Sequence, residues 1–435
     1  MRAHRWWAAV LVAGCSDRPV LDTEAMNSTG TTGGSTAEPN VPTTSEAASS
    51  SGTGEVVATT GPGTSGSSSE GSSSADSGSS TTGVEVCGPP CDDPWVMQGD
   101  LTISSGASTE QYACLTQIVG TLAISGDADA TALAGLRNLQ EVERLRLEFN
   151  SVLTDLSPFA CLEHAREQLS IYQAPALMDA SALAGLRSAA YVSFEQTGLA
   201  ALPGFSPEFA GLSNLYVRGN PALVDLDVVA GWGFIGGFDL AIQLDDNPAL
   251  ASVAGLAGLI EGVGDAGAAV QITKAPALGS LEGLEPLVRG SLWLEGLTAL
   301  TDLAPLANLV DGYNVTLVGL PKIESLHGLH NMATVSTLIV GNCIDDEMAG
   351  MDGLVDLAGL DALTTAYTLA IANNANMSAL TGAPLLTTVT TLNVVDNPGL
   401  AQADVDALIG QLGATPDQQC FGGWNQCQCY QLMPW

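Results

Sequence analysis

Short runs in which apolar and polar residues alternate recur along most of the chain. Residues 214–226 read NLYVRGNPALVDL, where Leu215 and Val217 alternate with Tyr216 and Arg218. This alternation predicts a half-buried β-strand. The Gly-Asn-Pro sequence that follows predicts a turn, and two leucines three residues apart then lead back toward the next run.

The same pattern repeats often enough to predict a repeat architecture. The first apolar residues of thirteen such strands, most often 23 positions apart, are Leu101, Leu122, Leu145, Leu169, Val192, Leu215, Leu240, Val270, Leu292, Val315, Leu338, Leu369 and Leu392. Most repeats also carry apolar residues 8, 11 and 14 positions later, such as Leu300, Leu303 and Leu306. One strand with its return limb does not bury its own apolar edge, but stacked turns bury each other's. Residues 87–435 are therefore predicted to form a mainly β solenoid of about 13 turns.

Several of these repeats resemble those of a known family. Cys114 is followed by apolar residues, a glycine and an L-x-I strand, and later repeats continue as x-x-N-x-x-L-x-x-L-x-G-L. Over about residues 97–400 this pattern resembles the receptor L-domain, the leucine-rich-repeat-like solenoid of insulin- and growth-factor-receptor ectodomains. The resemblance implies a right-handed solenoid with short irregular, 3₁₀ or helical return limbs. It also implies that an asparagine after the strand bonds neighbouring turns, at Asn150, Asn220, Asn374 and Asn397. Other repeats have Ala, Thr or Leu there and depart from a strict leucine-rich repeat.

Two repeats are longer than the rest, and one segment near the end has a helical pattern. For the insertions within residues 240–270 and 338–369, the alternatives are a short helix in the return limb or a loop on a binding side. In residues 402–412, Val405, Leu408 and Leu412 share one helical face, and Gly413 follows as a terminator. We expect this helix to cap the C-terminal end of the stack, which otherwise exposes a sheet edge.

The N-terminus has the features of an export signal. A basic start precedes an apolar run that is too short to span a bilayer and fits the core of a signal peptide over residues 1–14. The run ends at V-A-G-C, which resembles a bacterial lipobox, and the resemblance implies that Cys15 is the lipidated residue anchoring the protein to a membrane. Ser16 favours the outer membrane, with the domain facing the cell surface or the periplasm. A chance cysteine in an ordinary leader is the alternative.

The segment between this cysteine and the repeats has a different composition. Residues 15–86 are dominated by Ser, Thr and Gly and contain no Phe, Trp or Tyr. Such a segment buries too little apolar surface to offset the entropy lost on ordering. We therefore expect residues 15–86 to be a disordered stalk.

Charge and motif content exclude several classes of function. With 12 Lys and Arg against 47 Asp and Glu, the formal net charge is −35, whereas a nucleic-acid-binding protein needs a basic surface. Walker and G-x-S-x-G motifs and a Ser-His-Asp arrangement are missing, so we predict neither catalytic residues nor a cofactor. His327 and His330 have no carboxylate cluster nearby, so no metal site is predicted there. The acidic residues 345–352 are expected to be a solvated loop, with a weak calcium site as the alternative.

Eight cysteines besides Cys15 fall near the two ends of the repeats. They are Cys87, Cys91, Cys114, Cys161, Cys343, Cys420, Cys427 and Cys429. Two even sets in an exported protein predict disulfides. We favour a Cys91–Cys114 pair and a pair among the last three, with Cys161 and Cys343 as buried free thiols. A zinc site at the C-x-C of residues 427–429 is the alternative.

The outward positions of the predicted strands carry the side chains most typical of binding surfaces. Tyr, Trp and Arg are enriched at binding hot spots, and the candidate ligand-binding residues are Arg146, Tyr172, Tyr191, Tyr216, Arg218, Trp293 and Glu295. Ordinary cross-strand pairing is the alternative explanation for these residues. Further along, the outward positions become apolar, at Ala370, Ala372 and Val395.

These features together predict a monomeric lipoprotein of the cell surface. Its solenoid would bind a protein or a glycan without catalysis. A carbohydrate-active enzyme built on a β-solenoid and a purely structural envelope component are the alternatives.

Overall fold

The structure is a computed structural model that describes residues 87–88, 91–234, 240–341 and 350–422. The predicted signal peptide, Cys15 and stalk lie outside these residues, as do Cys343, Cys427, Cys429 and residues 345–349 of the acidic loop. The statements below concern the described part of the chain.

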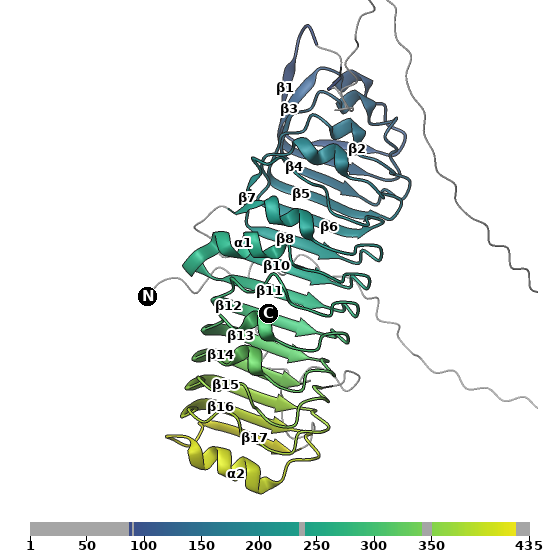
Figure 1. The fold of residues 1–435 in the computed structure, drawn as a ribbon. Helices are drawn as coiled ribbons and strands as arrows, with labels where there is room; N and C mark the ends of the chain where they lie inside the picture. Colours follow the sequence, from purple (N-terminus) through teal and green to yellow (C-terminus); the bar gives the residue numbers. More distant parts are fainter. Residues whose placement is uncertain (1–86, 89–90, 235–239, 342–349, 423–435) are drawn as a thin grey trace, which may run out of the picture. The chain divides into compact units, whose positions relative to one another are not determined.

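One parallel sheet runs through the described residues, and its strands follow one another almost in chain order (Figure 1). All its pairings are parallel. Its fifteen strands are β1 (Trp95–Gln98), β2 (Leu101–Ser104), β3 (Leu115–Ser125), β4 (Glu141–Glu148), β5 (His164–Ala174), β6 (Tyr191–Thr197), β8 (Asn214–Arg218), β10 (Leu240–Asp245), β11 (Ala268–Thr273), β12 (Arg289–Glu295), β13 (Asp311–Val318), β14 (Thr334–Gly341), β15 (Thr365–Ala372), β16 (Thr388–Val395) and β17 (Gln418–Gly422). The short strands β7 (Ala210–Leu212) and β9 (Gly233–Phe234) pair separately. The predicted mainly β, parallel architecture is confirmed.

The strand register tests the repeat alignment residue by residue. Twelve of the thirteen predicted first apolar residues stand opposite one another across the sheet. The exception is Leu240, because Ile242 is the residue paired with Leu215 and Val270. β10 begins at Leu240, opposite Ala268 of β11, and Leu240 and Ile242 are both buried inward residues of this strand. The alignment at Leu240 was therefore wrong by two residues.

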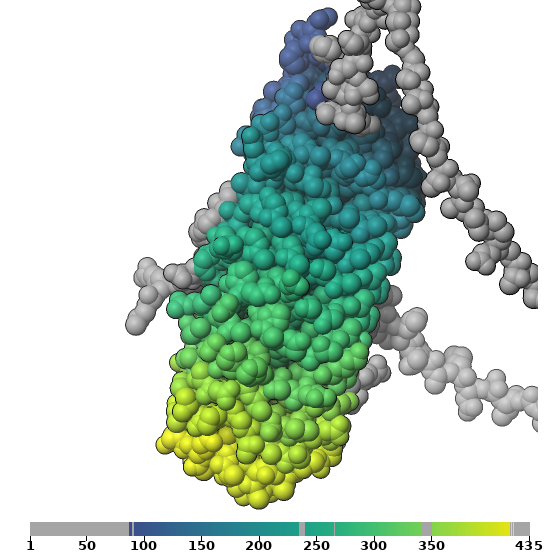
Figure 2. Space-filling view, in the orientation of Figure 1, coloured from purple at the N-terminus to yellow at the C-terminus, as the bar shows by residue number. Residues whose placement is uncertain are grey.

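The return limbs close the core on one side of the sheet. Short 3₁₀ helices follow most strands, at η3 (Glu110–Tyr112), η4 (Ala134–Leu136), η5 (Ser157–Phe159), η6 (Ser181–Gly185), η7 (Asp227–Gly231), η8 (Gly264–Ala266), η9 (Ala304–Leu306) and η10 (His327–Leu329). Leu300, Leu303 and Leu306 are buried in one contiguous core with the inward residues of the strands. The insertion after β10 contains the short helix α1 (Leu256–Val263). In the space-filling view the turns form one continuous surface (Figure 2).

Buried asparagines connect successive turns where the strands end. The Asn220 side chain accepts hydrogen bonds from the Thr197 backbone N–H (3.0 Å) and hydroxyl (2.6 Å), and donates to the Phe194 carbonyl (2.9 Å). The residue before it, Gly219, has φ of +64°, a left-handed conformation that glycine adopts without strain. Asn247 makes equivalent bonds one turn later, and the misaligned Leu240 hid it.

The C-terminal end is closed by a helix and a strand together. Helix α2 (Gln402–Gln411) confirms the predicted helix and buries Val405 and Leu408. Its Gln411 side chain donates to the carbonyls of Ala383 (2.7 Å) and Leu386 (3.0 Å). The free edge of β16, however, is paired by β17 rather than covered by the helix. We had not predicted β17.

Two disulfides tie the N-terminal turns together. The bond between Cys91 and Cys114 is the pair favoured from the sequence. The second bond joins Cys87 to Cys161 across 74 residues, so the prediction of a free thiol at Cys161 was wrong. Spacing alone did not reveal this pair, because stacking brings distant turns into contact.

Candidate functional site

The parallel register lines up the outward side chains of successive strands into rows. We call the sheet face opposite the core the outer face. Its row at the carboxyl ends of the strands, here called the polar ridge, consists of Glu148, Tyr172, Glu195, Arg218, Asp245, Thr273 and Glu295. The adjacent central row consists of Arg146, Ser170, Ser193, Tyr216, Gln243, Gln271 and Trp293. Tyr191 lies in the next row, between Gln168 and Asn214. The candidate residues predicted from the sequence are thus brought onto one face.

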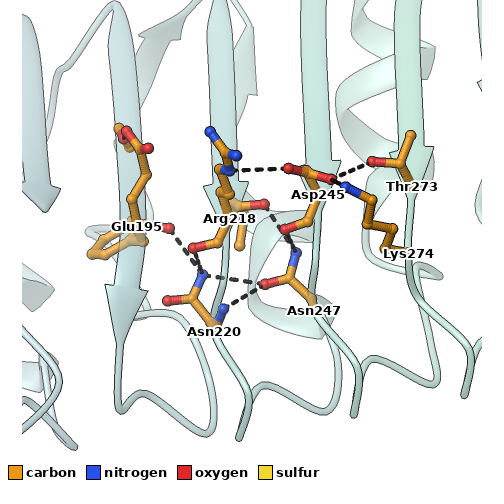
Figure 3. Close-up of polar contacts among 10 residues, drawn as sticks. Glu195, Arg218, Asn220, Asp245, Asn247, Thr273 and Lys274 are labelled. Carbon is orange, nitrogen blue, oxygen red and sulfur yellow. Dashed lines mark hydrogen bonds and ion pairs between the residues drawn. The ribbon is translucent and has the colours of Figure 1, made fainter. Parts of the chain in front are cut away.

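Asp245 is the most connected group on the polar ridge (Figure 3). Its carboxylate accepts the Thr273 hydroxyl at 2.6 Å and pairs with Arg218 Nε at 3.0 Å and Lys274 Nζ at 3.9 Å. Only 18% of the Asp245 side chain is exposed, whereas about half of each cation is exposed. The carboxylate therefore holds Arg218 at a fixed position while leaving much of the guanidinium open to solvent.

A second cluster surrounds Glu195 on β6. Its carboxylate accepts the Ser193 hydroxyl at 2.9 Å. Burial raises the pKa of Glu195 above its ordinary value, although Ser193 and then Arg218 act in the opposite direction. Burial and then the Glu195 charge raise the pKa of Tyr191 to about 12 and also raise that of Tyr216. Two tyrosines thus remain neutral hydrogen-bonding groups beside a carboxylate over the physiological range.

The N-terminal part of the outer face carries a pair of aromatic residues in edge-to-face contact. Tyr172 lies edge-on to Phe149, with ring centroids 5.3 Å apart and planes at 80°. Phe149 follows β4 and is largely exposed. Arg146 pairs with Glu148 two residues further along the same strand, rather than with a residue of a neighbouring strand. The sequence reading missed Phe149 because it falls just beyond the strand, in the left-handed position of the turn.

Trp293 and Glu295, the last two candidate residues in the sequence, lie at the C-terminal end of the two polar rows. The Trp293 indole N–H donates to the Glu295 carboxylate at 2.9 Å. Glu295 is only 7% exposed, so its carboxylate accepts this hydrogen bond in a largely buried position. Beyond β12 the outward positions Ala370, Ala372 and Val395 are apolar, as predicted, but they are also buried.

The register also explains why one ridge residue, Asp245, was missed. With Leu240 as the alignment point, the ridge position of β10 falls on Gln243. The observed register instead places Asp245 there, next to Arg218, and Thr273 after it. Aligning on the asparagine of the turn, Asn247, gives the correct register from the sequence.

The described residues provide little for metal chemistry. They contain no group of three or more His, Cys, Asp and Glu side chains placed to hold a metal ion. His327 and His330 stack with ring centroids 4.6 Å apart on a return limb. His327, together with Lys322 and Glu324, lines a hollow of about 630 Å³. Within the same residues, the helices are all too short or too polar to traverse a bilayer.

Comparison with known proteins does not assign the chain to a family. No protein-family model matches it, and no curated protein matches it significantly in sequence.

Proposed function

We propose that this protein is a non-catalytic recognition protein that binds a protein or glycan ligand through the outer face of β4–β12. The observation that carries the proposal is the polar ridge with its central row, where tyrosine, arginine and tryptophan side chains gather on one rigid sheet. Ion pairs and hydrogen bonds fix these side chains in place. A preorganised surface loses little entropy when it binds.

The chemistry of this surface fits ligands that present hydroxyl and amide groups. Neutral Tyr191 and Tyr216 donate and accept hydrogen bonds, and the half-exposed Arg218 adds charge-assisted donors. The rings of Tyr172 and Phe149 add apolar area. A flat sheet with these groups suits an extended glycan chain or a protein surface better than a small molecule enclosed in a pocket.

We also propose how the domain is displayed. The V-A-G-C sequence supports cleavage of residues 1–14 and lipidation of Cys15, with residues 15–86 as a stalk from the outer membrane. The parallel strand order supports a solenoid of the receptor L-domain type. A right-handed path is favoured because nearly all parallel crossovers are right-handed. If Cys15 is the anchor, replacing it by Ser should remove the protein from the detergent phase. A Ser variant that stays in the detergent phase would refute this assignment.

Binding to arrays of glycans and of surface proteins tests the proposal. We expect Tyr216→Ala and Arg218→Ala to weaken binding of any captured ligand by about 30-fold or more, the effect of losing a hot-spot side chain. Tyr313→Ala is the matched control, because Tyr313 is an exposed strand tyrosine on β13, outside the candidate rows. Equal affinities for the wild type and all three variants would refute the assignment of the face.

A second function, glycan cleavage, is favoured by one observation. Glu195 has a raised pKa, and the next ridge carboxylate, Asp245, lies two strands away, about 9–10 Å at the backbone. Inverting glycosidases use an acid and a base about 6.5–9.5 Å apart. Asp245, however, already engages Thr273, Arg218 and Lys274, which makes it a poor base. If the protein released new reducing ends from a bound glycan, and if Glu195→Gln abolished this release, the protein would be a glycan-cleaving enzyme.

A further inference from the structure

Three neighbouring strands near the C-terminal end of the sheet begin with closely similar polar quartets. The strands β14, β15 and β16 start with TVST, TAYT and TVTT. The second residue of each quartet, at Val335, Ala366 and Val389, is buried in the core, whereas the other three are exposed or half-buried. We call these outward residues the threonine face: it consists of Ser336, Tyr367 and the threonines of the three quartets.

The parallel register arranges the threonine face in straight rows. The fourth residues of the quartets stand directly opposite one another, at Thr337, Thr368 and Thr391. The first residues of the quartets, which are also threonines, pair across the strands in the same way. Neighbouring strands of a sheet lie about 4.8 Å apart. Identical side chains therefore recur at a fixed spacing on a rigid surface, which loses little entropy on binding.

Most hydroxyl groups of the threonine face are available to a ligand. The Thr334 hydroxyl donates to the Asp311 carboxylate at 2.9 Å. Within the described residues, the other hydroxyl groups of this face make no hydrogen bond to the protein. Each of them offers one donor and two acceptor positions. Tyr367 lies among these groups and is 59% exposed, so its aromatic ring is accessible as well.

The threonine face is uncharged, unlike the polar ridge. The strands β14, β15 and β16 contain no charged residue, although the protein has a formal net charge of −35. The acidic protein repels an anionic polymer. A charged protein surface would lose hydration here without gaining an ion pair, and such burial of unpaired charge is costly. A neutral ligand with many hydroxyl groups avoids both costs, so the charge of this face favours an uncharged partner.

A linear polysaccharide has the chemistry that this face requires. Its hydroxyl groups donate and accept hydrogen bonds as those of threonine do, and the apolar face of a sugar ring packs against an aromatic ring such as that of Tyr367. An extended chain that crosses the strands meets several threonines in succession. We propose that the threonine face is a second binding surface, which takes a linear uncharged polysaccharide lying across β14–β16. This inference does not depend on ligand binding at the polar ridge, whose residues belong to other strands.

Affinity electrophoresis of the full-length protein tests the proposal. Native gels would contain hydroxyethylcellulose, laminarin or dextran as neutral polysaccharides, or polygalacturonate as an anionic one. We expect at least one neutral polysaccharide to retard the protein relative to a gel without polymer, and we expect polygalacturonate not to retard it. If none of the three neutral polysaccharides retarded the protein, the proposal would be refuted. Retardation by polygalacturonate alone would refute it as well.

Variants show which surface holds the polysaccharide. The triple variant Thr337→Val, Thr368→Val and Thr391→Val removes three hydroxyl groups but keeps β-branched side chains that suit a strand. We expect this variant and Tyr367→Ala, each checked for folding by circular dichroism, to bind the retarding polysaccharide about 10-fold more weakly or worse.

Tyr216→Ala is the matched control, because Tyr216 belongs to the central row beside the polar ridge. This variant should bind the polysaccharide as the wild type does. Weaker binding by Tyr216→Ala, with unchanged binding by both threonine-face variants, would place the polysaccharide on the polar ridge. That result would overturn the second surface while supporting the proposed function. Equal binding by the wild type and all variants would also overturn the second surface.

Discussion

Replacing Asn220 by alanine tests whether side-chain bonds between turns stabilise the stack. Asn220 is fully buried. Its amide makes five hydrogen bonds, to two groups of Thr197, to the carbonyls of Phe194 and Arg218, and to the Asn247 side chain. The first three of these reach back to the preceding turn.

The expected loss follows from the groups left behind. A buried polar group that loses its partner costs about 1–3 kcal/mol. If the Thr197 N–H and the Phe194 carbonyl both lose theirs, the free energy of unfolding falls by about 2–6 kcal/mol. We expect about 3 kcal/mol, which is a large fraction of the roughly 5–15 kcal/mol that stabilises most proteins.

Urea unfolding of the full-length protein, followed by circular dichroism, measures this loss. With a slope of about 3 kcal/mol/M, the unfolding midpoint should fall by about 1 M. Asn214→Ala is the matched control: Asn214 is a half-buried asparagine at the start of β8, the strand that precedes Asn220, and its amide donates to Ser213 at 2.8 Å. It should change stability by no more than about 0.5 kcal/mol. Equal midpoints for the two variants would refute the role assigned to the asparagines.

Three further predictions concern the core, the outer face and the N-terminal disulfides. Leu303→Ala should lower the free energy of unfolding by about 2–5 kcal/mol, because Leu303 is fully packed; a change below about 1 kcal/mol in urea would contradict the packing. Since the folded pKa of Tyr191 lies at about 12 against an ordinary 10.0, stability should fall as the pH rises from about 10 to 12, and Tyr191→Phe should fall less; parallel pH-stability curves would contradict this. Replacing Cys87 and Cys161 together by serine should cost up to about 4 kcal/mol, because their bond closes a loop of 74 residues; an unchanged urea midpoint would show that this bond does not stabilise the fold.

The repeat period of the sequence predicted the sheet because stacked turns pack together only when their strands are in register. In a stacked repeat every inward strand position must fill the same layer of the core, so twelve of thirteen alignment residues fell in register. Leu240 failed because alternation alone does not distinguish two inward residues of a longer strand. The edge strands β1 and β17 were missed because their sequences, WVMQ and QQCFG, lack the L-x-I pattern of the repeats.

The sequence predicted which face of the sheet carries the candidate site, but not the contacts between its side chains. A residue at an outward position needs only to be compatible with a β-strand. The residue types at these positions therefore indicated a binding face, but they did not indicate which of these side chains contact one another. The pairing of Arg218 with Asp245 depends on a register that the alignment placed wrongly. The burial of Glu295 and of outward residues such as Ala370 and Val395 depends on packing against the outer face, which strand alternation does not encode. Disulfide pairing likewise depends on which turns come together in space.

Folding alone does not explain the composition of the polar ridge. The ion pair of Arg218 with Asp245, in which the cation is half exposed, is expected to contribute only about 1 kcal/mol, and partial burial disfavours the charged form of Glu195. Serine or threonine at these positions, as at Ser193 and Thr273, would continue the strands equally well. The charged and aromatic side chains therefore bring the fold little stability, and contact with a ligand is the interaction in which their fixed positions would lower the free energy.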